Sequence, residues 1–338
     1  MQKTRIALDA MGGDQAPDAV LAGTLLACDP LGGLRIAPER VLLVGDRERI
    51  EPRLAELGGD PGVEILHASQ VIGMHEHPAT ALRAKRDSSI SRCVQAVAEG
   101  AAGGLISMGN TGAVVGASTL GLGTLPGVRR PGIAVTLDLT GQPVTLIDMG
   151  ANIVPKPQHL YQYGVMGAVY MRDCLGTAKP RVALLNIGEE SSKGTEVLRE
   201  AHALLEESSL EFVGNIEGGD LFQGIADVVV SDGFTGNVVL KLMEGFAGFM
   251  LGLVLRELKA HDVTWGPEAL ARVERNIDYS AYGGALLLGV SGIVVIGHGR
   301  SGAQAVANAI SLAARTLDAG VNEDIVRGLE SGAREATT

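Results

Sequence analysis

Short runs of apolar, β-branched residues alternate along the chain with polar or glycine-rich loops and with amphipathic stretches of helical length. Apolar runs bounded by Gly, Asp or Asn are typical of buried strands. We expect such strands at residues 5–9, 41–44, 63–66, 105–107, 182–185, 228–230 and 294–296. This alternation predicts parallel strands joined by right-handed helical crossovers.

Residues 133–147 depart from this pattern. Residues 133–137 and 144–147 are both apolar and β-branched, and Thr140-Gly141-Gln142-Pro143 between them favours a tight turn. The resulting hairpin would place an antiparallel pair in a mixed, mostly parallel sheet. A length of 338 residues fits two domains or one large α/β unit. Because no Pro- or Ser-rich linker marks a boundary, we expect a single catalytic unit over residues 1–334, with two intertwined lobes as the alternative.

Residues 238–259 form an unusually apolar helical segment. A helix that is apolar on nearly all sides is buried, either in its own subunit or against a partner. A loop with the only tryptophan, Trp265, and a second helical segment at 268–276 follow. We therefore expect a protruding helical hairpin at 238–277 that dimerises and contacts a membrane surface. The apolar run at 245–255 is shorter than the roughly 20 residues that a membrane span needs.

Composition narrows the class of protein. With 3% aromatic residues and 47 glycines, the core must consist of Val, Ile, Leu and Ala, which suits a buried parallel sheet. The formal net charge of −11 argues against nucleic acid as a partner. The cysteines have no CxxC spacing and the first residues no secretory signal pattern. We expect a cytoplasmic protein with free thiols.

Glycine-rich loops follow several of the expected strands and lead into helices. The N–H groups and the positive dipole end of a helix N-terminus favour anions, so loops of this kind together predict a phosphate-holding site. These loops are Asp9-Ala10-Met11-Gly12-Gly13-Asp14, Gly109-Asn110-Thr111-Gly112, Asp148-Met149-Gly150-Ala151-Asn152, 186–194 and 231–237.

Several familiar sites are absent from the sequence. It has no G-x-G-x-x-G after the first strand, no G-x-x-x-x-G-K-[ST] and no G-x-S-x-G. His75 and His77 flank Glu76, but no further His or Cys lies at metal-ligand spacing, so a surface loop is favoured over a metal site. We expect neither a cofactor nor a metal.

Three residues in these loops are candidates for chemistry. Lys193 precedes a helix expected at 194–206, where a cation is unfavourable for the helix dipole unless it holds an anion; the alternative is a solvated lysine. Asn237 is either a site residue or a simple N-cap of its helix. His298, between two glycines, is either a phosphate or acid–base contact or a turn residue.

Eight motifs along the chain form a recognisable set. They are residues 6–14, 109–113, Gly150-Ala151-Asn152, 185–190 with Lys193-Gly194, Gly214-Asn215-Ile216-Glu217-Gly218, 232–237, Tyr282-Gly283-Gly284-Ala285 and His298-Gly299. With these motifs, in family order over nearly its whole length, the chain closely resembles the bacterial acyl-carrier-protein:phosphate acyltransferases of phospholipid synthesis. Met108, Gly219 and Arg300 depart from the family pattern and put local loop geometry in question.

The resemblance implies a three-layer α/β/α fold, similar to isocitrate and isopropylmalate dehydrogenases and to phosphotransacetylase. It also implies a homodimer, peripheral association with the inner face of the cell membrane, and delivery of the acyl phosphate product to a membrane glycerol-phosphate acyltransferase. Lys193 and Asn237 match the catalytic residues. We expect contacts with inorganic phosphate or substrate from Asp9, Gly12, Gly13, Asn110, Thr111, Gly112, Asp148, Asn152, Glu189, Asp232, Gly236 and His298.

A mechanism follows from these residues. Phosphate is itself a nucleophile, and a thiol of pKa about 8.5 leaves with little protonation. Our hypothesis is that phosphate sits on the loop N–H groups with Lys193, which Asp232 and Glu189 orient, and that Asn237 supports phosphate or the oxyanion. An acyl-CoA or acetyl-CoA phosphotransacylase and a non-catalytic acyl-binding membrane scaffold are the alternatives.

Acyl carrier protein is acidic, so an acidic enzyme needs a local basic dock. Arg83, Lys85, Arg86 and Arg92 are opposed only by Asp87 over ten residues, and Arg129-Arg130 forms a second cluster. We favour the first cluster as the dock; the alternative is a solvated helix face.

Overall fold

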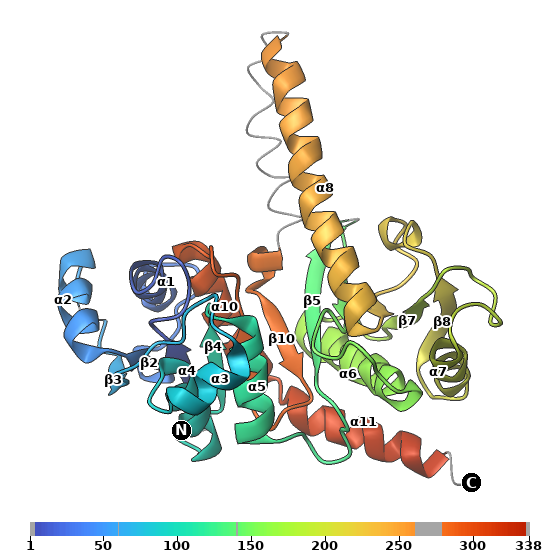
Figure 1. Ribbon diagram of the computed structural model, residues 1–338, viewed down its shortest axis with the longest axis horizontal. Helices are drawn as coiled ribbons and strands as arrows, with labels where there is room; N and C mark the ends of the chain where they lie inside the picture. Colours follow the sequence, from blue (N-terminus) through green and yellow to red (C-terminus); the bar gives the residue numbers. More distant parts are fainter. Residues whose placement is uncertain (1–3, 60, 140, 261–278, 336–338) are drawn as a thin grey trace. The chain divides into compact units, whose positions relative to one another are not determined.

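The computed structural model describes residues 4–59, 61–139, 141–260 and 279–335. The chain divides into two compact units, unit 1 (Met1–Pro131 and Tyr282–Arg327) and unit 2 (Gly132–Ala281 and Gly328–Thr338). Each is described by itself below (Figure 1).

Unit 1 contains a mostly parallel sheet with the strand order β3-β2-β1-β4-β11-β10. All neighbouring strands are parallel except β10 and β11. Every residue of β1, β2 and β4 is buried, as expected of strands covered on both faces. The strands are β1 (Ile6–Asp9), β2 (Val41–Gly45), β3 (Glu64–His67), β4 (Gly104–Ser107), β10 (Ala285–Leu288) and β11 (Ile293–Ile296).

Helices pack on this sheet in two groups. Helix α1 packs against α10, so closely that a Cβ on Gly23 would lie 2.5 Å from the Cβ of Val306. Helix α4 packs against α5 and lies on β1 and β4 (Figure 1). The helices of unit 1 are α1 (Asp18–Cys28), α2 (Arg47–Leu57), α3 (Pro78–Ala84), α4 (Ser89–Ala98), α5 (Thr111–Leu122) and α10 (Ala303–Asp318), with a short 3-10 turn at Pro38–Arg40. Helix α11 (Val321–Glu335) and the 3-10 turn at Tyr279–Tyr282 each have residues in both units.

Within unit 2 the strand order is β5-β6-β9-β7-β8. The predicted hairpin is confirmed: β5 and β6 are antiparallel, whereas the remaining neighbours are parallel. Helix α6 lies on this sheet, and its Gly167 closely approaches Val228 of β9. The elements are β5 (Gly132–Asp138), β6 (Pro143–Ile147), α6 (Pro157–Leu175), β7 (Arg181–Leu185), α7 (Glu196–Glu206), β8 (Glu211–Ile216), a 3-10 turn at Asp220–Phe222, β9 (Val228–Val230) and α8 (Gly233–Ala260).

The predicted mixed, mostly parallel α/β architecture is therefore confirmed. The apolar runs did not reveal β8 and β10. Strand β8 is interrupted by Gly214 and Asn215 and is partly exposed, and β10 is a short run after Gly283 and Gly284. Helix α7 begins at Glu196, two residues later than expected, because the Thr195 side chain accepts the N–H of Leu198 and caps it.

Helix α8 is the longest helix that the structure describes, with 28 residues, and it extends away from the sheet of unit 2 (Figure 1). Apolar side chains are exposed along it at a spacing of mostly four residues, which makes a stripe on one face. The exposed residues are Phe234, Val238, Leu242, Phe246, Phe249 and Met250, and we call them the α8 stripe. The alternative that this helix is buried in its own subunit is wrong for the described residues.

By length and composition alone, α8 could cross a membrane: its most apolar 18-residue window has a mean hydropathy of 1.9 and is 6% buried. One such helix is weak evidence for a span. A cavity of about 710 Å³ runs along part of α8, between Val239–Val254 and the side chains of Leu139, Leu221 and Phe222. Trp265 and the expected return helix at 268–276 lie outside the described residues.

The start of α8 is fixed by close contact with the loop after β6. A Cβ on Gly236 would lie 2.1 Å from the carbonyl oxygen of Asp148, whereas a Cβ on Gly245 of the same helix would meet nothing within 4 Å.

We therefore predict that Gly236→Ala lowers the free energy of unfolding by about 1–3 kcal/mol through overpacking. Gly245→Ala is the matched control and should leave it unchanged or raise it by about 0.5–1 kcal/mol, because Ala favours the helix. Urea denaturation followed by circular dichroism measures both. Equal effects of the two substitutions would contradict the close contact.

Candidate active site

In unit 1, the predicted site residues lie at the carboxyl ends of three adjacent parallel strands. Asp9 is the last residue of β1, and Gly12 and Gly13 follow it. Residues Asn110, Thr111 and Gly112 follow β4, and His298 follows β11. The loops after β1 and β11 are also joined directly, since the Asp14 N–H donates to the Gly299 carbonyl at 2.7 Å. The structure thus brings these sequence-distant loops together.

Asp9 shapes its own loop. Its fully buried carboxylate accepts the N–H groups of Met11 and Gly12 at 3.0 Å and the Ser107 hydroxyl at 2.6 Å. Burial raises the pKa of Asp9, and these hydrogen bonds act against that increase. Gly12 is needed here, because a Cβ would lie 2.5 Å from an oxygen of Asp9.

Asn110 caps α5 and tethers a neighbouring loop. Its Oδ1 accepts the Ala113 N–H at 3.1 Å, and its Nδ2 donates to the carbonyls of Met74 and Glu76 at 3.0 Å. Thr111 and Gly112 are exposed in the first turn of the helix, with Gly112 against Pro78. Asn110 therefore links the loop after β4 to the segment that leads into α3.

His298 lies beside a tightly packed turn. Its Nδ1 accepts the Arg300 N–H at 3.2 Å, and its side chain is half-buried. Gly13 has a φ of +104°, which favours glycine, and a Cβ there would lie 3.2 Å from the Gly299 carbonyl oxygen. The geometry fits a turn residue and leaves a phosphate contact as a prediction.

Asp148, directly after β6 in unit 2, accepts backbone N–H groups of its own loop, as Asp9 does in unit 1. Oδ1 of the buried Asp148 accepts N–H groups from Ile133, Gly150 and Ala151, and its Oδ2 accepts the Asn152 N–H at 2.7 Å. Burial raises the pKa of Asp148 against the effect of these bonds. We expected phosphate to accept hydrogen bonds from the N–H groups of these two loops. In both loops, some of these N–H groups instead donate to the loop's own carboxylate.

Asn152 extends this arrangement into the core. Its Nδ2 donates to Oδ2 of Asp148 at 3.2 Å and to the hydroxyl of the buried Tyr163, on α6, at 2.8 Å. Its carbonyl accepts the N–H of Gly233, the first residue of α8. The loop after β6 therefore holds the start of α8.

The start of α8 corrects two expectations. The alternative reading of Asn237 as an N-cap is wrong, because α8 begins at Gly233 and Asp232 caps it: the Asp232 carboxylate accepts the N–H and the hydroxyl of Thr235 at 2.8 and 2.7 Å. The second expectation was that Asp232 orients Lys193; its carboxylate instead accepts hydrogen bonds from Thr235. Asn237 is exposed one turn further on, and its side chain lies over Gly150.

Lys193 lies in an exposed loop after β7, the strand beside β9. Its ammonium is 3.9 Å from Oε2 of Glu190, so Glu190 rather than the predicted Glu189 is its carboxylate neighbour. Glu189 is exposed. Strands β6, β9 and β7 are adjacent and parallel, so the Asp148 loop, the start of α8 with Asn237 and the Lys193 loop follow the same ends of these strands. An exposed ammonium and an exposed amide at one edge suit the binding of an anion.

Sequence reasoning overlooked the residues that hold this loop. Asn186 and Asn215 are both buried and donate to carbonyls of the Lys193 loop. Both asparagines lie in motifs that carried the family resemblance, which was the available signal.

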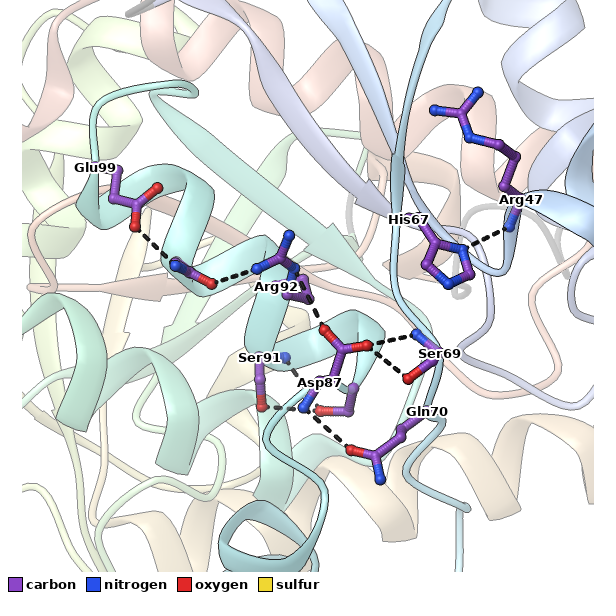
Figure 2. A network of polar contacts seen from close by, with 10 residues as sticks. Arg47, His67, Ser69, Gln70, Asp87, Ser91, Arg92 and Glu99 are labelled. Carbon is purple, nitrogen blue, oxygen red and sulfur yellow. Dashed lines mark hydrogen bonds and ion pairs between the residues drawn. The ribbon is translucent and has the colours of Figure 1, made fainter.

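The predicted basic dock is partly neutralised within unit 1. Lys85 donates to Glu76 and to the Val71 carbonyl. Arg92 lies 3.6 Å from Asp87, which also accepts the N–H and hydroxyl of Ser69 (Figure 2).

The bonds from Ser69 hold the pKa of Asp87 below its ordinary value. Arg83 and Arg86 are exposed and carry the remaining positive charge of the cluster. Among the described residues, no three His, Cys, Asp or Glu side chains are grouped to hold a metal ion.

Solved structures establish the fold class. The chain is similar to a phosphotransacetylase from Streptococcus pyogenes, with a TM-score of 0.61 and 17% identity over 93% of this chain and 94% of that one. The EutD phosphotransacetylase from Staphylococcus aureus gives a TM-score of 0.60 at 16% identity, with the same coverage. A putative 4-hydroxythreonine-4-phosphate dehydrogenase from Salmonella typhimurium gives 0.54 at 15%, covering 92% of this chain and 99% of that one. The fold is therefore that of the phosphotransacylases and related dehydrogenases.

Sequence relatives then identify the family. Residues 4–324 match the family model described as fatty acid synthesis protein. A phosphate acyltransferase from Pelotomaculum thermopropionicum is 44% identical over 332 residues, covering 97% of this chain and 95% of the relative. One from Myxococcus xanthus is 45% identical over 333 residues, covering 96% and 93%. The chain belongs to the phosphate acyltransferase family, which confirms the predicted resemblance: it is an acyltransferase of lipid biosynthesis that transfers an acyl group to phosphate.

Proposed function

We propose that the acyl donor is a fatty acyl thioester of acyl carrier protein and that bound inorganic phosphate attacks the thioester directly. The acyl phosphate then serves phosphatidic acid synthesis through a membrane glycerol-phosphate acyltransferase. The observation that carries this proposal is the exposed pair of Lys193 and Asn237 at one edge of the unit 2 sheet.

In this mechanism the protein supplies position and charge. The Lys193 ammonium neutralises phosphate, so that a phosphate oxygen can approach the thioester carbonyl. Asn237 donates from its amide to phosphate or to the oxyanion that forms at the carbonyl. The carbon–sulfur bond then breaks, and the thiolate leaves. The N–H groups bound by Asp9 and Asp148 keep their structural role throughout.

We predict that Lys193→Ala lowers the rate of acyl phosphate formation by about 10²-fold or more and leaves the fold intact. Lys179→Ala is the matched control, because Lys179 is an exposed lysine before β7, at the other end of that strand. Acyl phosphate is trapped with hydroxylamine after incubation with acyl carrier protein thioester and phosphate. Near-normal turnover by Lys193→Ala would refute its role.

The same assay separates the alternatives. An acyl-CoA phosphotransacylase would prefer the CoA thioester over the carrier-protein thioester at equal concentration. A non-catalytic acyl-binding scaffold would release no thiol from either donor. Membership of the phosphate acyltransferase family favours acyl transfer to phosphate over a non-catalytic scaffold.

The dock for the acidic carrier protein is proposed at Arg83 and Arg86, since Lys85 and Arg92 have acidic partners in their own unit. Charge reversal of exposed arginines slows association with an acidic partner and weakens the complex.

We predict that Arg83→Glu with Arg86→Glu raises the KM for carrier-protein thioester by about five- to tenfold and leaves the KM for a small acyl thioester unchanged. Arg49→Glu with Lys179→Glu makes the same change in charge at exposed residues elsewhere. Steady-state rates with both donors measure the effect. An equal rise in the control would point to net charge instead of a dock.

The α8 stripe supports a homodimer. Six exposed apolar side chains on one helix are more than scattered surface residues and favour a protein or lipid contact. We place the partner subunit on this stripe. The cytoplasmic enzyme then associates peripherally with the inner face of the cell membrane, which co-sedimentation of the full chain with anionic phospholipid vesicles tests.

We predict that Phe246→Glu shifts the protein from dimer toward monomer, because a carboxylate would have to be buried in the interface. Leu120→Glu, at a residue of α5 that is 85% exposed, should leave the mass unchanged. Light scattering over a range of concentrations gives the mass. A dimer that persists in Phe246→Glu would remove the stripe from the interface.

A further inference from the structure

The loop that carries Lys193 is exposed, yet one of its turns is held at both ends. The Lys193 N–H donates to the Glu190 carbonyl at 3.0 Å and closes a turn over residues 190–193. Glu190, Ser191, Ser192 and Lys193 are all exposed. A solvent-exposed turn of this kind is mobile unless other groups fix its backbone.

Asn186 holds the Lys193 end of this turn. From the carboxyl end of β7, its Nδ2 donates to the Lys193 carbonyl at 3.2 Å, while its Oδ1 accepts the Ile187 N–H at 2.9 Å. The next residue must be glycine: Gly194 has a φ of +82°, and a Cβ there would lie 2.4 Å from Oδ1 of Asn186. Arg199 adds a bond to the Gly194 carbonyl at 2.7 Å.

Asn215 holds the Glu190 end of the turn. From β8, its Nδ2 donates to the Glu190 carbonyl at 3.0 Å. Its Oδ1 lies 3.1 Å from Nδ1 of His202, on α7. A carbonyl can only accept, so the amide must present its NH₂ to Glu190 and its oxygen to His202, which in turn must carry a proton on Nδ1.

His202 is itself fixed by packing. Its side chain is buried, and its ring meets the Phe212 ring edge-on, with the centroids 5.0 Å apart and an interplanar angle of 76°. The chain of contacts therefore runs from the buried ring of His202, through the buried amide of Asn215, to the backbone of Glu190.

We propose that Asn215, oriented by His202, is a positioning residue for Lys193. It contacts no substrate and acts through the Glu190–Lys193 turn, whose other end Asn186 holds. The inference rests on the proposed function, in which the Lys193 ammonium contacts phosphate. A displacement of about 1 Å of a catalytic group can cost about 10²-fold in rate, so a fixed turn matters for phosphate and has no direct effect on the acyl donor.

Asn215→Asp tests the link. It keeps an oxygen toward His202 and replaces the donor to Glu190 with a second oxygen, so the bond to the loop is lost, and it also adds a buried carboxylate. The matched control is Asn322→Asp in unit 1, where the Nδ2 of Asn322 donates to the Val290 carbonyl at 3.1 Å. His202→Phe is a second variant that adds no buried charge and frees the amide to rotate.

Rates are measured with phosphate and carrier-protein thioester varied in turn, together with hydrogen–deuterium exchange of peptides covering residues 187–194. We expect Asn215→Asp to lower kcat/KM for phosphate by about 10- to 100-fold, to leave the donor KM within about twofold, and to speed exchange in this loop. His202→Phe should change the same quantities in the same direction by a smaller factor, and Asn322→Asp should change none.

The Lys193→Ala background separates this inference from the proposed function. If Asn215 acts through Lys193, Asn215→Asp causes no further loss of residual rate there. Unchanged kcat/KM for phosphate in both Asn215→Asp and His202→Phe, or an equal loss with and without Lys193, would overturn the inference alone. Near-normal turnover by Lys193→Ala, in which Asn215 is intact, would overturn the proposed function.

Discussion

The described structure depends on the burial of two carboxylates at the ends of strands. An ionised carboxylate away from water is costly unless donors surround it, and in each unit most of these donors are backbone N–H groups of the loop that follows. Asp9 and Asp148 both accept the N–H groups two and three residues ahead with Oδ1. The same solution at β1 and at β6 makes each glycine-rich loop a rigid support for the helix or loop beside it.

The support in unit 2 determines where Asn237, one of the two residues proposed as catalytic, lies. Asp148 and Asn152 hold the first turn of α8, and Gly236 allows that turn to contact the Asp148 carbonyl directly. Asn237 is presented one residue later, over Gly150. On the neighbouring strands, the asparagine amides of Asn186 and Asn215 fix the Lys193 loop. The exposed side chains that we propose as catalytic thus rest on buried, hydrogen-bonded polar groups.

Sequence patterns predicted the strands well because buried parallel strands are continuous apolar runs, and they predicted the hairpin from its turn. They failed where several polar residues in one loop could take the same role, and where a tertiary contact decides. Asn237 was a possible helix cap, but Asp232, five residues earlier, caps the helix. Glu189 and Glu190 cannot be told apart without the loop's path, and the pairing of Lys85 with Glu76 needs the packing of α3. The sequence pattern of an apolar helix such as α8 does not distinguish burial in the subunit's own core from burial against another molecule.

The α8 stripe also affects how newly synthesised chains behave before another molecule covers this helix. Until then, several aromatic and aliphatic side chains remain in contact with water on a helix that extends away from its sheet. Unprotected surface of this kind promotes indiscriminate association between newly made chains. Yield and solubility in a host cell should therefore vary with expression level, and dilute, slow synthesis should favour correctly assembled protein over aggregates.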